Sequence, residues 1–215
     1  LRLPRAAGAA VRPAWRAQRA ALEASAMPEQ AVTRWREVEQ QWRQRTRTDL
    51  AAEAALQVAA IEYLERQQWS AAAAAAERAA QDFAALGDLA LQADAALLLG
   101  AARAELASID PRVPADAIAG PLTSARRIYQ QLGAPVAAAE ALNFEGIAQF
   151  NRGDLEAAAA IFGRAAGEYR QADAPARYRI ALMNLASVQF DRGDYRGSAR
   201  SFDALLAGAA SQDAA

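Results

Sequence analysis

A 40-residue internal repeat constrains the fold of this chain more than any other feature of the sequence. The segments 141–155 and 181–195 align without a gap, and Phe162 and Phe202 keep the same offset further along the chain. Apolar residues recur at helical spacing within each unit. Repeats of 20 to 50 residues with this spacing are typical of α-solenoids, in which stacked helical units build one continuous core. The repeat therefore predicts an all-α helical array.

Small residues on the first helix of each predicted hairpin give the register of the array. They recur at intervals of 40, 40, 46 and 40 residues, at Ala20, Ala60, Gly100, Gly146 and Ala186. A second series on the other helix places a six-residue insertion between Gly100 and Ile118, and the stretch 108–114, with its two prolines, is predicted to form it as a loop. We expect about five antiparallel helix hairpins, stacked as a right-handed α-solenoid superhelix.

Composition and charge divide the chain into four predicted parts. Residues 1–13 are predicted to be a flexible Arg-rich arm, and residues 14–48 a degenerate, polar-faced hairpin that caps the array. Residues 49–207 are predicted to form four hairpins, and residues 208–215 a flexible tail. The charge is uneven, because residues 1–47 carry a balance of +6 whereas the remainder carries −7.

Glycine–aspartate pairs at 87–88, 153–154 and 193–194 predict turns between helices. Glycine tolerates the left-handed conformation that ends a helix, and the aspartate side chain accepts hydrogen bonds from the free N–H groups of the next helix. Pro135 and Pro175 are predicted to lie in the first turn of a helix, where a missing N–H costs nothing.

Several residue types that carry enzymatic and metal chemistry are absent. The chain has no cysteine and no histidine, and all 24 basic residues are arginine. Thiol chemistry, histidine acid–base chemistry and Schiff-base formation are therefore excluded, and no phosphate loop or nucleophile elbow is found. Carboxylate pairs such as Glu62 and Glu65 are predicted to lie on a solvated face. We predict a protein that is not an enzyme, with no cofactor and no metal site.

The sequence does not determine the cellular compartment of the protein. No apolar run reaches the 18 or more residues that a membrane-spanning helix needs, so we expect a soluble chain. A sequence without cysteine suits the cytoplasm and the periplasm equally. Because the sequence begins with Leu1 rather than methionine, we expect that a leader or further sequence has been removed from it.

The two clearest units resemble the tetratricopeptide repeat, in which an apolar residue, a Leu-Gly pair, an aromatic residue, a turn, an alanine and a phenylalanine recur over about 34 residues. The matching residues are Leu142, Gly146, Phe150, Gly153, Asp154, Leu155, Ala158, Phe162 and Ala165, then Leu182, Leu185, Ala186, Phe190, Gly193, Asp194, Tyr195, Ser198 and Phe202. The resemblance covers about residues 49–207. It implies a tetratricopeptide-like solenoid of the long-period bacterial type, within a larger protein or complex.

Two departures from the family pattern carry expectations of their own. The longer period implies that the second helix of each pair is about six residues longer than in the family. Glu145 stands where the family has an apolar residue, next to Gly146, and is expected to loosen helix packing locally.

The resemblance also implies where a partner binds, because the first helices of tetratricopeptide arrays line the concave face. It places the partner-binding residues at Asn143, Ile147, Asn151, Ile180, Met183, Asn184, Ser187 and Asp191. The amides of Asn143 and Asn184 suit a partner's backbone, since they both donate and accept; the alternative is that each faces solvent or braces a neighbouring helix. Met183, Ile147 and Ile180 form either an adaptable apolar floor or packing between repeats.

We therefore predict a non-catalytic protein–protein interaction scaffold that binds a peptide or protein segment. The groove positions lean acidic and lysine is absent, so the carboxylate clamp of the chaperone-binding subfamily is not expected, and a neutral or basic segment suits the groove better. The alternative is a regulatory or sensory segment that binds nucleic acid or an anionic surface through the Arg-rich N-terminal end. Self-association through exposed solenoid ends is a third possibility.

Overall fold

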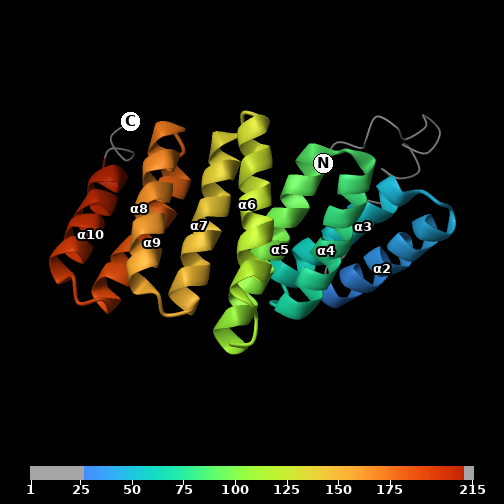
Figure 1. Cartoon of the computed structure of the whole chain (residues 1–215), viewed down its shortest axis with the longest axis horizontal. Coiled ribbons are helices and arrows are strands. Elements are labelled where there is room, and N and C mark those ends of the chain that lie inside the picture. The colour runs from blue at the N-terminus through green and yellow to red at the C-terminus, as the bar shows by residue number, and fades with distance from the viewer. Residues whose placement is uncertain (1–26, 211–215) are drawn as a thin grey trace. The chain divides into compact units, whose positions relative to one another are not determined.

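A computed structural model describes residues 27–210 of the 215-residue chain, with side chains described as far as residue 206. The predicted arm 1–13 and residues 14–26 of the predicted capping hairpin lie outside the described residues, as do residues 211–215. Every regular element in the described part is an α-helix (Figure 1), which confirms the prediction of an all-α helical-repeat solenoid.

The chain divides into two units within helix α5, and each unit is described by itself. The first unit ends at Ala102 and contains α2 (Pro28–Gln44), α3 (Thr48–Leu64), α4 (Trp69–Leu86) and the first part of α5 (Leu89–Ile109). The second unit begins at Arg103 and contains the rest of α5, α6 (Ala115–Gln131), α7 (Pro135–Asn151), α8 (Leu155–Gln171), α9 (Pro175–Asp191) and α10 (Tyr195–Ala210). Helices α6 to α10 lie side by side in chain order (Figure 1).

The turns between paired helices form as the sequence predicts. Gly153 adopts a φ of 80°, in the left-handed region that favours glycine. Oδ1 of Asp154 accepts a hydrogen bond from the backbone N–H of Ala157 at 3.0 Å, and so caps α8. Pro135 and Pro175 are the first residues of α7 and α9. Local sequence alone therefore defines where these helices begin and end.

One prediction about element length is wrong, and another differs only at one end. Helices α7 and α8 both have 17 residues, so the second helix of this pair is not the longer one. The predicted loop 108–114 forms over residues 110–114, because α5 continues to Ile109 and has 21 residues. The helix stops where Pro111 disfavours the helical conformation of the residue before it, and the insertion mainly lengthens α5.

In the second unit, α7 packs closely on α8 because Gly146 leaves room for an aromatic ring. A Cβ atom on Gly146 would lie 2.7 Å from Cε1 of Phe162, which is closer than such atoms approach. Phe162 is only 2% exposed and shares a cluster with Ala158 and with Val188 of α9. The small residue identified from the repeat therefore lies at a close helix–helix contact.

In the first unit, alanine takes the same role along most of a helix. The run of alanines in α4 supplies Ala72, Ala75 and Ala76, which are buried in one cluster with residues of α2 and α3. Trp35 of α2 is the largest side chain that is fully buried there. One large side chain thus fills the space that several small ones leave.

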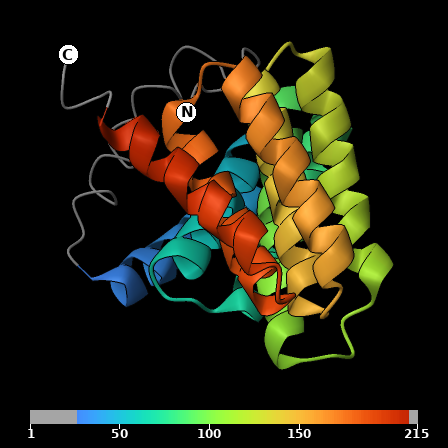
Figure 2. The ribbon, with the colours of Figure 1, turned by 90° about the vertical axis from the view of Figure 1, so that its left-hand side faces the viewer.

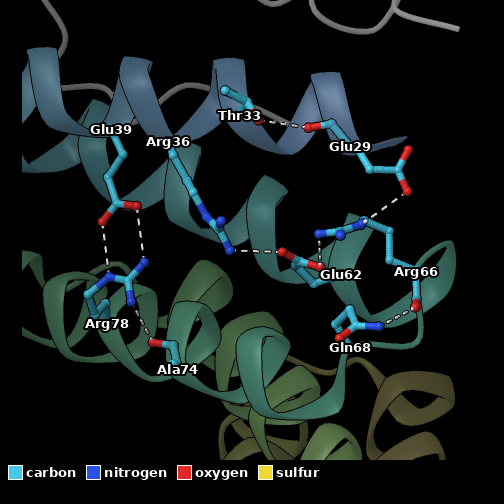
Figure 3. A network of polar contacts seen from close by, with 9 residues as sticks. All are labelled: Glu29, Thr33, Arg36, Glu39, Glu62, Arg66, Gln68, Ala74 and Arg78. Atoms are coloured by element: carbon cyan, nitrogen blue, oxygen red, sulfur yellow. Dashed lines mark hydrogen bonds and ion pairs between the residues drawn. The ribbon is translucent and has the colours of Figure 1, made fainter. Parts of the chain in front are cut away.

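Two buried carboxylates connect the helices of the first unit (Figure 3). Glu62 of α3 is 0% exposed, and its two oxygens accept hydrogen bonds from Arg36 of α2 at 2.8 Å and from Arg66 at 2.7 Å. The prediction that Glu62 faces solvent is wrong, because α2 lies across it; Glu65 is exposed. Without these arginines the buried charge would have no compensation.

Glu39 of α2 is the second of these carboxylates (Figure 3). It is nearly buried and accepts hydrogen bonds from Arg43 and from Arg78 of α4, each at 3.0 to 3.2 Å. Arg43 also donates to Asp82 at 2.8 Å. Arg36 and Arg43 of α2 are therefore engaged in contacts inside the unit.

We expect Gly146→Ala to destabilise the fold by about 1–3 kcal/mol, since the added methyl group must displace the buried ring of Phe162. Gly163→Ala, in a helix position with open space around it, is the matched control and should raise stability by up to about 1 kcal/mol. Urea denaturation of both variants measures the difference. Equal effects of the two substitutions would contradict the close contact.

A second prediction concerns the buried carboxylate. Replacing both Arg36 and Arg66 by methionine leaves the buried charge of Glu62 without a partner. This should lower the free energy of unfolding by about 3 kcal/mol or more. Glu62→Met should cost less, because the two arginine side chains are 52% and 26% exposed and can turn to water. The triple replacement should recover most of the loss. Denaturant unfolding at neutral pH tests this order, and a Glu62→Met variant as unstable as the double arginine variant would refute it.

Candidate partner-binding surface

Helix α9 carries four of the predicted partner-binding residues on its exposed side. Ile180 and Met183 are 42% and 52% exposed, and Ser187 and Asp191 are also exposed. Their spacing of three, four and four residues places them along one side of a helix. The Ser187 hydroxyl donates to the backbone carbonyl of Met183 at 3.0 Å. We call this row the α9 face; it offers an apolar pair followed by a polar pair.

Asn143 of α7 does not form the exposed groove amide that the resemblance implies. Its side chain is buried, and its Oδ1 accepts a hydrogen bond from Nδ2 of Asn184 on α9 at 3.3 Å. Asn184 is half-buried. The two amides therefore brace neighbouring helices, because α9 covers the position on α7 that would otherwise face a partner.

The two remaining predicted residues on α7 also make contacts inside the second unit. Nδ2 of Asn151 donates to the backbone carbonyl of Ala104 at 2.9 Å, which connects α7 to the last part of α5. Ile147 is half-buried and packs against the cluster that contains Phe162 and Val188. Ile147 therefore packs between helices and does not form part of an exposed apolar floor. Among the predicted partner-binding residues, the exposed ones therefore all lie on α9.

An ion pair between α7 and α9 lies beside these residues. Arg177 Nη1 is 2.9 Å from Oε1 of Glu140. Burial raises the pKa of the Glu140 carboxyl, and the charge of Arg177 opposes that effect. The pair adds to the contacts between the two helices, whereas Asp191 places an exposed negative charge at the C-terminal end of α9.

A shallow pocket of about 140 Å³ opens between α6, α7 and α8. Ile118, Leu122 and Ile161 form much of its apolar lining, and Glu145 of α7 and Arg152, the residue after α7, supply polar groups. Burial raises the pKa of the Glu145 carboxyl, against the opposing charges of nearby arginines. Sequence reasoning noticed that Glu145 occupies an apolar position but did not find the pocket, which only the packing of three helices creates.

Within the described residues, acidic side chains form no group of three or more that could hold a metal ion. None of the described helices combines the length and the apolar character that crossing a bilayer requires.

The chain matches no known family model, and no curated protein is significantly similar in sequence. Solved structures that share its architecture include the following two. One is a Rap protein complexed with competence and sporulation factor, which has a TM-score of 0.67 and 18% identity over 84% of this chain and 48% of that chain. The other is BtubC (BKLC) from P. vanneervenii, with a TM-score of 0.65 and 19% identity over 86% of this chain and 72% of that chain.

At these identities the likeness shows the fold alone. The chain has a tetratricopeptide-like helical-repeat fold, as its sequence predicts. It spans about half the length of the Rap protein that it matches.

The burial of Glu145 leads to a prediction about pH. Because its pKa is raised in the folded state, folding favours the protonated carboxyl. The burial cost is therefore complete above that raised pKa, declines as pH falls through it, and is gone below the ordinary pKa of a glutamate carboxyl. Glu145→Gln should therefore raise the melting temperature at pH 7, and the gain should shrink toward zero near about pH 3.5. Glu65→Gln, at an exposed position, should change stability by less than about 0.5 kcal/mol at either pH. A Glu145→Gln gain that does not depend on pH would contradict this assignment.

Proposed function

We propose that this chain is a non-catalytic scaffold that binds a protein segment on the α9 face. The observation that carries the proposal is the row of exposed side chains along one first helix of the array, from Ile180 to Asp191. Large apolar residues exposed beside polar ones are typical of protein docking surfaces. The Rap protein that shares this fold was solved in complex with competence and sporulation factor, which supports a binding role for the fold.

The chemistry of the α9 face suggests the kind of segment that it accepts. Ile180 and Met183 are one turn apart, and the flexible thioether of Met183 adapts to differently shaped apolar side chains. Asp191 lies about 12 Å further along the helix axis, at 1.5 Å per residue, and favours a basic group. An extended segment covers this distance in about four residues. We infer a partner with an apolar residue and an arginine or lysine about four residues apart.

The alternative function rests on the Arg-rich N-terminal end and is less well supported. In the described part of that end, three arginines already form ion pairs. Arg36 pairs with Glu62, and Arg47 pairs with Asp49. Arg43 pairs with both Glu39 and Asp82. A guanidinium that already binds a carboxylate is a poorer contact for a phosphate, because the existing pair must break first. We therefore favour a protein partner over nucleic acid.

The larger context of the chain also belongs to this proposal. We infer that the array is one segment of a larger bacterial protein or complex, with the predicted arm, capping hairpin, repeat region 49–207 and tail as its parts. The Rap protein, of which the matching region is about half, offers an example of the same architecture within a longer chain.

Selection of random 12-residue peptides on the immobilised full chain tests the proposed site. A labelled synthetic copy of the best peptide is then titrated by fluorescence anisotropy. Met183→Ala combined with Asp191→Ala should weaken binding about tenfold or more, which corresponds to about 1.4 kcal/mol. Arg164→Ala combined with Gln171→Ala, at exposed positions of α8, is the matched control and should leave the affinity within about twofold.

The salt dependence of the same titration separates the two functions. Docking on the α9 face should lose little affinity between 50 and 200 mM salt, whereas contacts to a nucleic acid backbone lose about 10³-fold or more when many phosphates are neutralised. Unchanged binding by the Met183 and Asp191 variant would place the partner elsewhere on the chain and refute the proposed site.

A further inference from the structure

Helix α10 carries an apolar stripe on its outer side. Tyr195, Ala199, Phe202 and Leu206 follow one another at spacings of four, three and four residues, which aligns them along one side of the helix. Tyr195, Phe202 and Leu206 are 64%, 45% and 69% exposed, and Ala199 is also exposed. In Figure 2, α10 lies nearest the viewer, and no other described helix of the second unit covers it. We call these four residues the α10 stripe.

The corresponding positions of α8, 40 residues earlier, show what such a stripe does. They hold Leu155, Ala159, Phe162 and Ala166. The last three are no more than 8% exposed, and Leu155 packs against the same cluster as Phe162. The cover comes from α9, through Val188, Leu185, Ala181 and Leu182. On α8, therefore, this stripe is a face that binds another helix.

The side chains at both ends of the α10 stripe are larger than those on α8. Tyr195 stands at the position of Leu155, and Leu206 at the position of Ala166. A helix side that stays in water would be expected to carry polar residues at such positions. Phe190 of α9, which is 59% exposed, stacks edge-on against Tyr195 with ring centroids 5.3 Å apart and extends the apolar surface.

The contact between α8 and α9 also indicates the direction of a helix that would cover the α10 stripe. A three-residue turn, 172–174, joins these two helices, so α9 runs antiparallel to α8 across its stripe. The equivalent cover on α10 is then an antiparallel helix whose own apolar residues have matching spacing.

We propose that the α10 stripe binds the α10 stripe of a second copy of this chain, in an antiparallel two-fold dimer. With the symmetry axis between Arg200 and Ser201, Tyr195 lies opposite Leu206 of the second copy, and Ala199 lies opposite Phe202 of the second copy. Each large aromatic residue thus meets a smaller aliphatic one, which suits a self-complementary interface.

The charges beside the stripe fit the same arrangement. Arg196 and Asp203 are both exposed and lie two turns apart on the same flank of α10. In the antiparallel pair, the same flanks meet, and Asp203 comes opposite position 198 of the second copy, within a turn of its Arg196. Because of the two-fold symmetry, this ion pair forms twice in the dimer. The α9 face takes no part in these contacts, so the dimer does not depend on the proposed function.

Sedimentation equilibrium of the full chain from about 1 to 500 µM tests the dimer. One helix per copy makes a small interface, so we expect a dissociation constant of about 10–100 µM. Leu206→Asp should weaken the dimer about tenfold or more, because it places a charge in the apolar stripe. Leu132→Asp changes a leucine exposed elsewhere in the same unit and should leave dimerisation unchanged. Circular dichroism checks that both variants keep their helical content.

Charge reversal distinguishes this dimer from other modes of association. Arg196→Asp and Asp203→Arg should each raise the dissociation constant several-fold, to about tenfold, since each sets like charges against each other twice. The double variant that carries both changes should dimerise like the original chain. A chain that stays monomeric at about 500 µM would overturn the proposal and leave the stripe to a different protein. Association that is insensitive to Leu206→Asp, or that the double reversal does not restore, would overturn it as well.

Discussion

The close approach of helices over small side chains is the constraint on which the structure depends. In the second unit Gly146 leaves the space that the ring of Phe162 fills, and in the first unit the alanines of α4 allow the same closeness along several turns. Interaxial distance follows from the side chains at the contact, so a small residue at this position keeps the two helices of a hairpin close together.

Charged side chains take part in this packing where arginine can reach across helices. Glu62 and Glu39 sit inside the first unit because guanidinium groups from two sides satisfy their oxygens. Arginine suits this role better than lysine, since its planar group offers several donors in a fixed geometry. The net charge of a segment is therefore a poor guide to its surface here. Several arginines of α2 and of the helices that follow it form ion pairs within the first unit.

Helix ends and close contacts follow from local sequence, whereas burial does not. The Gly153–Asp154 turn and the helix starts at Pro135 and Pro175 could be predicted because each depends on neighbouring residues. Glu62 was misassigned because α3 is surrounded by other helices and lacks a clear polar side. Asn143 and Met183 occupy the same repeat position, yet they are 7% and 52% exposed. Helix α9 contacts Asn143 through Asn184, whereas Met183 is largely open to solvent.

The same dependence on neighbours explains why residues change between equivalent helices. Alanine at position 166 suits a helix that α9 approaches closely, since a larger side chain would push the two backbones apart. Leucine at position 206 is larger and would hold such a neighbour further away, whereas exposed to water its apolar surface contributes no burial energy. A helix held at a greater distance, with its own large side chains between the backbones, accommodates Leu206 and Tyr195 together. The residues of α10 thus match a contact between two similar, bulky stripes better than another step of the same repeat.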